Sequence, residues 1–149
     1  THLPGTLLNL GGMEQKGKDF ALFKDGLSYA CIQCMKLLET ERKQVLKAMG
    51  MECFASPIEP LLLMLKNPED HPELEIFRGL AGPDGPGHRF LTEDASCGVA
   101  LLVSSARKAG IEARMAEALL TLANGISETD YYRLGRTWEW IGEEREKIL

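Results

Sequence analysis

Residues 28–49 read SYACIQCMKLLETERKQVLKAM, the longest regular pattern in the sequence. Apolar side chains recur three or four positions apart, and charged residues, Glu39 and Arg42 among them, mostly fill the other faces. Ser28 can cap the first turn, and Gly50 follows the last one. The pattern predicts an amphipathic helix of about six turns.

Helical periodicity continues on both sides of this stretch, and no run alternates as a strand would. A short apolar helix is predicted around 61–65, opened by Pro57 and Pro60, and a longer one at 94–108. The next predicted helix is 113–123, which ends at Asn124-Gly125 and has its apolar face at Met115, Ala118, Leu119 and Leu122. A helix restarts at 127–130, and a last one carries Trp138 and Trp140. The segment 76–87 is expected to be a loop. We therefore expect an all-α, compact multi-helix domain that occupies residues 1–149 as a single unit.

Size and charge limit the functional classes. The chain has 149 residues, 44% of them hydrophobic, which suffices for one domain with a real core. The net charge of −5, with basic residues scattered among acids, argues against a nucleic-acid partner. The longest strongly apolar run, 61–65, is far too short for a membrane span, and the beginning of the sequence has no secretion signal. We expect a soluble, cytoplasmic protein without membrane contact.

Four cysteines, Cys31, Cys34, Cys53 and Cys97, raise the question of a metal or disulfide framework. Cys31 and Cys34 share one face of the long helix, but no second pair and no suitably spaced histidine completes a tetrahedral set. We expect reduced, buried thiols and no metal.

The most reactive stretch is His88-Arg89-Phe90-Leu91-Thr92-Glu93-Asp94, which follows the Gly- and Pro-rich loop 82–87. It joins a base, a cation, a hydroxyl and two carboxylates where a loop enters a helix, and such junctions favour anions. A capping cluster, with Thr92 as N-cap and Glu93 and Asp94 in the first turn, would look the same. Both interpretations stay open at this point.

A set of motifs in order along the chain resembles a known family. They are residues 2–11 (HLPGTLLNLG), 23–27 (FKDGL), the Glu41-Arg42 pair, 89–94 (RFLTED) and 135–137 (GRT). This set is similar to the α-helical C-terminal domain of opine dehydrogenases (octopine and nopaline dehydrogenases and relatives), a fold shared with 6-phosphogluconate-dehydrogenase-like proteins. The resemblance spans nearly the whole chain.

The resemblance implies an NAD(P)-dependent oxidoreductase acting on CH–NH donors. Its members join an amino acid and a 2-keto acid as an imine and reduce it to an opine. NAD or NADP would be bound mainly by an upstream Rossmann domain, since this sequence has no strand-turn-helix with Gly-x-Gly-x-x-Gly. We expect the chain to be part of a larger enzyme, inactive alone, with that Rossmann domain as its partner and a homodimer as a further possibility.

The resemblance also assigns site residues. His2 matches the family's catalytic histidine, Asp94 the aspartate that pairs with it, and Arg89 the arginine that binds a substrate carboxylate. Thr92 is either a substrate ligand or an N-cap. Asn9 either orients a substrate or makes a hydrogen bond within a helical turn.

Two other functions fit the same sequence. One is a non-catalytic all-α dimerisation or interaction domain, which would use the apolar run 61–65 and the two tryptophans as an interface. The other is the helical domain of a different dehydrogenase acting on another 2-keto or 2-hydroxy acid. Proximity of His2 to Asp94 in the fold would favour a catalytic domain over the non-catalytic interaction domain.

Overall fold

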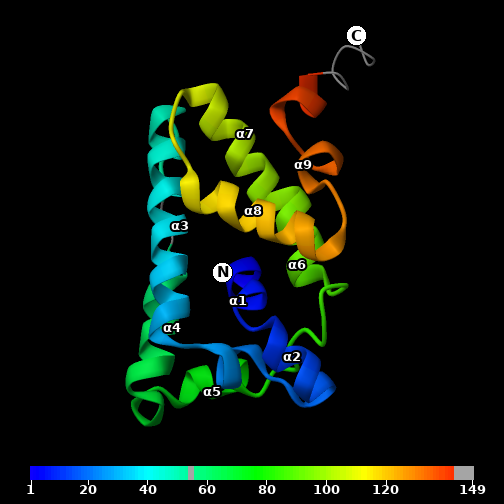
Figure 1. Ribbon diagram of the computed structural model, residues 1–149. Coiled ribbons are helices and arrows are strands. Elements are labelled where there is room, and N and C mark those ends of the chain that lie inside the picture. The colour runs from blue at the N-terminus through cyan, green and yellow to red at the C-terminus, as the bar shows by residue number, and fades with distance from the viewer. Residues whose placement is uncertain (54–55, 143–149) are drawn as a thin grey trace.

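The computed structural model describes residues 1–53 and 56–142, and all regular structure within these ranges is helical (Figure 1). The longest helix is α3 (Tyr29–Ala48). Its N-cap is Ser28, whose side chain accepts a hydrogen bond from the Cys31 backbone N–H at 3.2 Å. The all-α fold class and the long amphipathic helix are therefore confirmed.

The remaining elements follow in chain order. They are α1 (His2–Leu7), α2 (Leu10–Lys16), a 3-10 turn (Gly17–Asp19), a π turn (Leu22–Gly26), α4 (Ile58–Lys66), 3-10 turns at Pro68–Asp70 and Pro72–Leu74, α5 (Glu75–Arg78), α6 (Arg89–Glu93), a π-helical segment (Asp94–Val99), α7 (Ala100–Ala109), α8 (Arg114–Ser127) and α9 (Tyr131–Leu134). Residues 138–142 are again helical, as expected for the segment with the two tryptophans.

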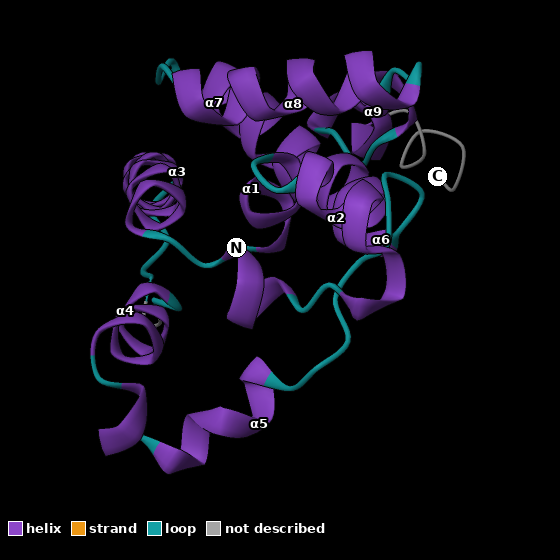
Figure 2. Ribbon diagram, turned by 60° about the horizontal axis from the view of Figure 1, so that its bottom comes forward, coloured by secondary structure: helices purple, strands orange, loops and turns teal. Residues whose placement is uncertain are grey.

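The main core lies where α1 meets the second half of the chain. The short helix α1 sits in the middle of the molecule and contacts α3, α6 and α8 (Figures 1 and 2). Leu3 from α1, Leu91 from α6, Val103 from α7 and Leu119 from α8 are almost completely buried in one cluster. Burial of this kind contributes roughly 1.5–3 kcal/mol per large side chain. The packing brings the first residues of the chain against the stretch 89–99.

Two smaller clusters extend this core. Helix α4 lies beside α3 (Figure 2), and Ile58, Leu61 and Met64 pack on Cys31, Ile32 and Met35. The predicted short apolar helix is thus confirmed, but only three of its nine residues are buried. The third cluster joins Met13, Phe20 and Leu22 near α2.

The structure differs from the prediction where α5 and α6 begin. The segment 76–87 was expected to be a loop throughout, but it begins inside α5. The helix expected from residue 94 begins at Arg89 and runs through the π-helical segment into α7. The helical segments at these two places have only four and five residues, so apolar periodicity is weak and tertiary contacts decide. Helix α7 ends as expected at Gly110, whose φ of 67° is left-handed.

The predicted face of α8 is wrong by about one position. The buried residues are Ala116, Leu119, Leu120 and Ala123, whereas Leu122 is 52% exposed. The small side chains of Ala116 and Ala123 let α8 lie close to α1 and the π-helical segment, and together with Leu119 and Leu120 they form the inner face. The helix also continues through Asn124 and Gly125 to Ser127, and its C-cap is Glu128, whose φ is 48°. The restart expected at 127–130 is therefore wrong, since the next helix, α9, begins at Tyr131.

Candidate active site

The stretch 88–99 is built around a π-helical turn. His88 is the N-cap of α6, because its Nδ1 accepts a hydrogen bond from the Phe90 backbone N–H at 3.2 Å. The N-cap expected at Thr92 is therefore wrong: Thr92 lies inside α6. Asp94 is the first residue of the π-helical segment, a conformation that often marks functional sites.

His2 and Asp94 meet across the interface of α1 and α6. The distance from His2 Nδ1 to Asp94 Oδ2 is 3.5 Å, and the side chains are 38% and 34% exposed. The pair is distant in the sequence, so the tertiary fold alone brings it together. Partial exposure leaves both groups accessible to a ligand.

Aromatic rings fix the orientation of the His2 imidazole. It stacks on Phe90 with ring centroids 3.9 Å apart and an angle of 5° between the planes. Phe23 approaches from another side at 6.4 Å in an edge-on arrangement. Because Phe90 and Asp94 both belong to the same stretch of chain, that stretch determines the position and the direction of the imidazole.

Asn9 connects the N-terminal helices to the π turn 22–26. Its side-chain nitrogen donates hydrogen bonds to the carbonyl oxygens of Gly5 at 2.8 Å and Gly26 at 3.0 Å. These bonds use both amide donors. The contact with Gly26 is tight, since a Cβ there would lie 2.9 Å from the Asn9 side chain. Asn9 thus holds the segment that carries Phe23 against α1.

Arg89 and Thr92 lie in a different hollow from the His2–Asp94 pair. They line an open groove of about 380 Å³ together with Glu93, Ser96, Tyr131 and Leu134. The Arg89 side chain is 70% exposed, 3.8 Å from Glu93 and 5.5 Å from the centre of the Phe90 ring. Phe90 is therefore the residue that links Arg89 to His2.

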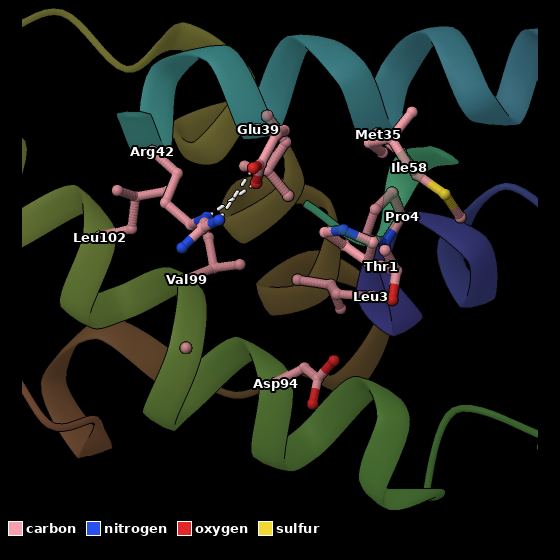
Figure 3. Close-up of a pocket in the computed structure, with 13 residues that line it drawn as sticks. Thr1, Leu3, Pro4, Met35, Glu39, Arg42, Ile58, Asp94, Val99 and Leu102 are labelled. Carbon is pink, nitrogen blue, oxygen red and sulfur yellow. Dashed lines mark hydrogen bonds and ion pairs between the residues drawn. The ribbon is translucent and has the colours of Figure 1, made fainter. Parts of the chain in front are cut away.

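A larger cavity opens beside Asp94, between α1, α3, α4 and α7. Its volume is about 490 Å³, in the range of small-molecule sites. Asp94 lines one wall, and Glu39 and Arg42 from α3 line the wall across from it (Figure 3). The sequence had placed Glu39 and Arg42 on outer faces of the helix; instead, Glu39 is only 9% exposed.

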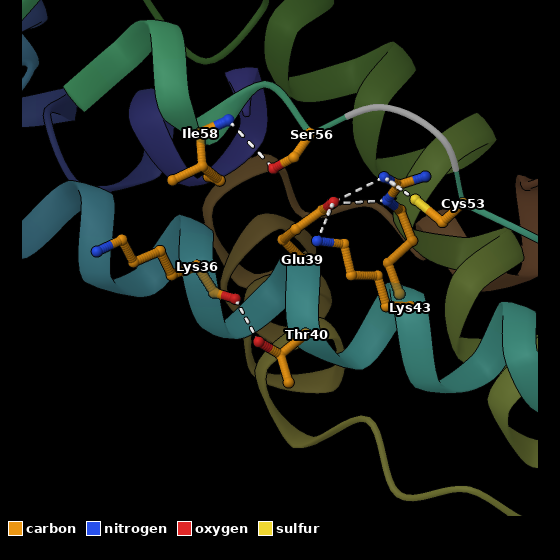
Figure 4. Close-up of polar contacts among 8 residues, drawn as sticks. Lys36, Glu39, Thr40, Lys43, Cys53, Ser56 and Ile58 are labelled. Carbon is orange, nitrogen blue, oxygen red and sulfur yellow. Dashed lines mark hydrogen bonds and ion pairs between the residues drawn. The ribbon is translucent and has the colours of Figure 1, made fainter. Parts of the chain in front are cut away.

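Glu39 and Arg42 form a two-pronged ion pair. Arg42 donates from Nε to Glu39 at 2.7 Å and from Nη2 at 2.8 Å, and Lys43 adds an ion pair at 3.6 Å (Figure 4). The hydrogen bonds from Arg42 lower the pKa of the Glu39 carboxyl. They raise the pKa of Arg42 in turn. This spacing of three along a helix was the sequence signal that would have revealed the pair.

The neighbouring Glu41 has a structural role. Its two carboxylate oxygens accept hydrogen bonds from the backbone N–H groups of Met115 at 2.8 Å and Ala116 at 2.9 Å. These are donors of the first turn of α8, which has no capping side chain of its own. Glu41 therefore joins α3 to α8.

The four cysteines are free. Only Cys31 is buried, so the expectation of buried thiols is wrong for the other three. Burial raises the pKa of the Cys31 thiol to about 11. Cys53 accepts a hydrogen bond from Arg42 at 2.9 Å. Across residues 1–53 and 56–142 no three metal-binding side chains come together, and no helix there is long and apolar enough to cross a membrane.

Comparison with known proteins gives two matches. Residues 1–127 match the family described as NAD/NADP octopine/nopaline dehydrogenase, alpha-helical domain. The chain is also similar to an opine dehydrogenase of Arthrobacter sp. (strain 1C), with 26% identity over 148 residues that cover 92% of this chain. The chain spans 39% of the length of that relative.

Proposed function

Because the chain belongs to the octopine/nopaline dehydrogenase family, as its α-helical domain, we propose that it is the catalytic helical domain of an opine dehydrogenase. In the proposed reaction, the amino group of an amino acid attacks the carbonyl carbon of a 2-keto acid, and water leaves to give an imine. Addition of a hydride to the imine carbon and a proton to nitrogen gives the opine.

The observation that carries this proposal is the His2–Asp94 pair. Its two members come from distant parts of the sequence and lie 3.5 Å apart beside a cavity of about 490 Å³. An interaction domain without chemistry would not require this arrangement, nor a ring stacked to hold the imidazole in one plane.

The pair is suited to proton transfer at the condensation step. An imidazole changes its charge near neutral pH, so it can both donate and accept a proton. With Asp94 at Nδ1, the proton on that nitrogen is held and Nε2 is left for the substrate. We propose that Nε2 donates a proton to the hydroxyl group that leaves as water, and that Asp94 stabilises the imidazolium. The distance of 3.5 Å is longer than a good hydrogen bond and would shorten with substrate in place.

The described residues contain no Rossmann-type dinucleotide site. NAD or NADP supplies hydride in this family, but a Rossmann site needs a strand that leads into a glycine-rich turn. The glycine-rich loop 82–87 follows α5, and Gly82 donates a hydrogen bond to the Phe20 carbonyl at 3.1 Å. A Cβ at Gly82 would lie 2.8 Å from the Leu22 backbone nitrogen, so this loop packs on its own chain. We propose that a Rossmann domain of the same enzyme holds the cofactor.

Arg89 is the proposed partner of the keto-acid carboxylate. Its exposed guanidinium makes a long ion pair with Glu93, at 3.8 Å, and it can offer two parallel donors to a carboxylate. Arg89 and His2 both contact the Phe90 ring. Thr92 lines the same groove and is a further candidate ligand there.

The test is a double-mutant cycle on the full-length protein, with oxidation of NAD(P)H followed in the presence of pyruvate and an amino acid. His2→Ala and Asp94→Asn should each reduce turnover roughly 100-fold or more, as expected for loss of acid–base catalysis. The double variant should be little worse than either single one, because both residues serve one proton transfer.

His71→Ala is the matched control, since His71 pairs with Glu73 at 3.0 Å on a distant turn. It should keep wild-type turnover. Wild-type turnover in both single variants of the pair would refute the catalytic assignment. Oxidation that needs the keto acid but no amino acid would instead favour a 2-hydroxy acid dehydrogenase.

A further inference from the structure

The cavity beside Asp94 has mainly apolar walls. They are supplied by all the elements that surround it, with Leu3 from α1, Met35 and Leu38 from α3, Ile58 from α4, and Val99 and Leu102 from the opposite side (Figure 3). Such a lining fits hydrocarbon groups better than water or charged groups.

On the α3 side of the cavity the two charged residues neutralise each other, and Thr1 and Asp94 are the other polar residues of the lining. Glu39 and Arg42 satisfy each other through two hydrogen bonds of 2.7 and 2.8 Å, and the Glu39 side chain is only 10% exposed. A charged guest at this end would lose its hydration and would have to compete with an existing two-pronged pair. The cavity therefore favours an uncharged guest.

Asp94 joins this cavity to the proton-transfer pair. It lines the cavity wall and at the same time lies 3.5 Å from His2. A molecule with one end in the cavity would thus have its other end at the site where the imine forms. The groove of Arg89 lies apart and does not share this lining.

We propose that the cavity binds the side chain of the amino-acid substrate and selects an uncharged aliphatic one. The inference rests on the proposed function, because it assigns one of the two substrates of that reaction to a place. The amino group then lies toward Asp94, and as the free amine it attacks the keto acid, which approaches from the side of His2.

The first experiment compares amino acids with the full-length enzyme at fixed pyruvate and NAD(P)H. Each methylene group that is buried improves kcat/KM roughly fourfold. L-leucine should therefore exceed L-alanine by roughly tenfold or more. L-arginine and L-glutamate should fall below L-leucine by a similar factor, because their charges would be desolvated in the cavity.

The second experiment changes the cavity. Leu102→Trp fills it and should lower kcat/KM for L-leucine roughly tenfold while L-alanine stays within about threefold. Leu102→Ala enlarges it and should raise the ratio of L-phenylalanine to L-leucine. The control is Leu122→Trp, the same substitution at a position that is 52% exposed on α8, and it should leave all ratios unchanged.

Ratios between substrates make the result independent of the amount of folded protein. An enzyme that condenses amino acids with pyruvate but keeps its substrate ratios in both Leu102 variants would overturn this inference and leave the proposed function standing. Higher kcat/KM for charged than for aliphatic amino acids would overturn it as well. Absence of turnover with every amino acid and keto acid would overturn the proposed function and this inference with it.

Discussion

Phe90 and Asp94 constrain His2 from two directions, one through the face of the imidazole ring and the other through its Nδ1. A stacked ring limits rotation about the side-chain bonds, and a carboxylate at one nitrogen selects the tautomer. Neither contact alone would fix both the plane and the protonation pattern. Two side chains four positions apart on the same stretch therefore hold the imidazole in the orientation that the proposed proton transfer needs.

Arg89→Lys tests the proposed carboxylate partner. A lysine keeps the charge but replaces a two-pronged donor by a single point, so we expect the KM for pyruvate to rise roughly tenfold with a smaller change in kcat. Steady-state kinetics with varied pyruvate measure this. Arg114→Lys is the control, because Arg114 is 81% exposed and pairs with Glu112 on a distant turn. Equal KM values in the wild type and Arg89→Lys would remove Arg89 from the site.

Single residues show what a sequence can and cannot reveal. The residues of the pair were identified by the family resemblance, and the structure brings His2 and Asp94 together. Glu39 and Arg42 were missed because charged residues on a helix usually face solvent. The capping role of His88 was missed because histidine is an uncommon N-cap, whereas Thr92 in the same stretch is a common type.

At the scale of elements, the π-helical segment 94–99 depends on a turn much later in the chain. The Arg136 backbone N–H donates a hydrogen bond to the Ser96 carbonyl at 3.0 Å, and Ser96 Oγ donates to the Thr92 carbonyl at 2.8 Å. These bonds satisfy carbonyl groups in a stretch where the regular helical pattern is interrupted. The turn that contains Arg136 therefore contacts the π-helical segment directly.

Gly135→Ala should disturb this contact. A Cβ at Gly135 would lie 2.5 Å from the Tyr131 carbonyl oxygen and closer still to the Ser96 carbonyl, and backbone atoms cannot move aside easily. We expect a loss of about 1–3 kcal/mol in the free energy of unfolding, and lower turnover because Asp94 begins the displaced segment. Denaturant unfolding and steady-state kinetics measure the two effects.

Gly125→Ala is the control for this substitution. Gly125 lies within α8, and its Cβ would meet nothing within 4 Å. Alanine favours a helix over glycine by about 1 kcal/mol, so this variant should be as stable as the wild type or more stable. If Gly135→Ala behaved in the same way, the turn would not support the π-helical segment.

At the scale of the whole molecule, features that depend on residues close in the sequence were predicted, and features that depend on long-range contacts were not. Local periodicity predicted the long helix and the positions of most others, because those patterns depend on neighbouring residues. The phase of α8 and the central place of α1 depend on which surfaces meet, and a single sequence carries little information on that. The cavity is a product of this packing, since its walls come from α1, α3, α4 and the stretch that includes Val99 and Leu102.

The same arrangement predicts which domain of the proposed enzyme binds the cofactor. The described residues hold the His2–Asp94 pair and a cavity, but they contain no strand and therefore no strand-turn-helix for a pyrophosphate. We expect residues 1–149, produced alone, to show no measurable NADH or NADPH binding in a fluorescence titration up to roughly 1 mM cofactor. A dissociation constant of about 1 mM corresponds to only about 4 kcal/mol of binding free energy.

Circular dichroism should show that this chain is helical, so that loss of folding does not explain the result. The full-length protein is the positive control and should bind the cofactor with or without Asp94→Asn, because the proposed role of Asp94 is in proton transfer and not in cofactor binding. Tight binding by residues 1–149 would mean that a cofactor site lies among the helices, and the division between the two domains would have to be abandoned.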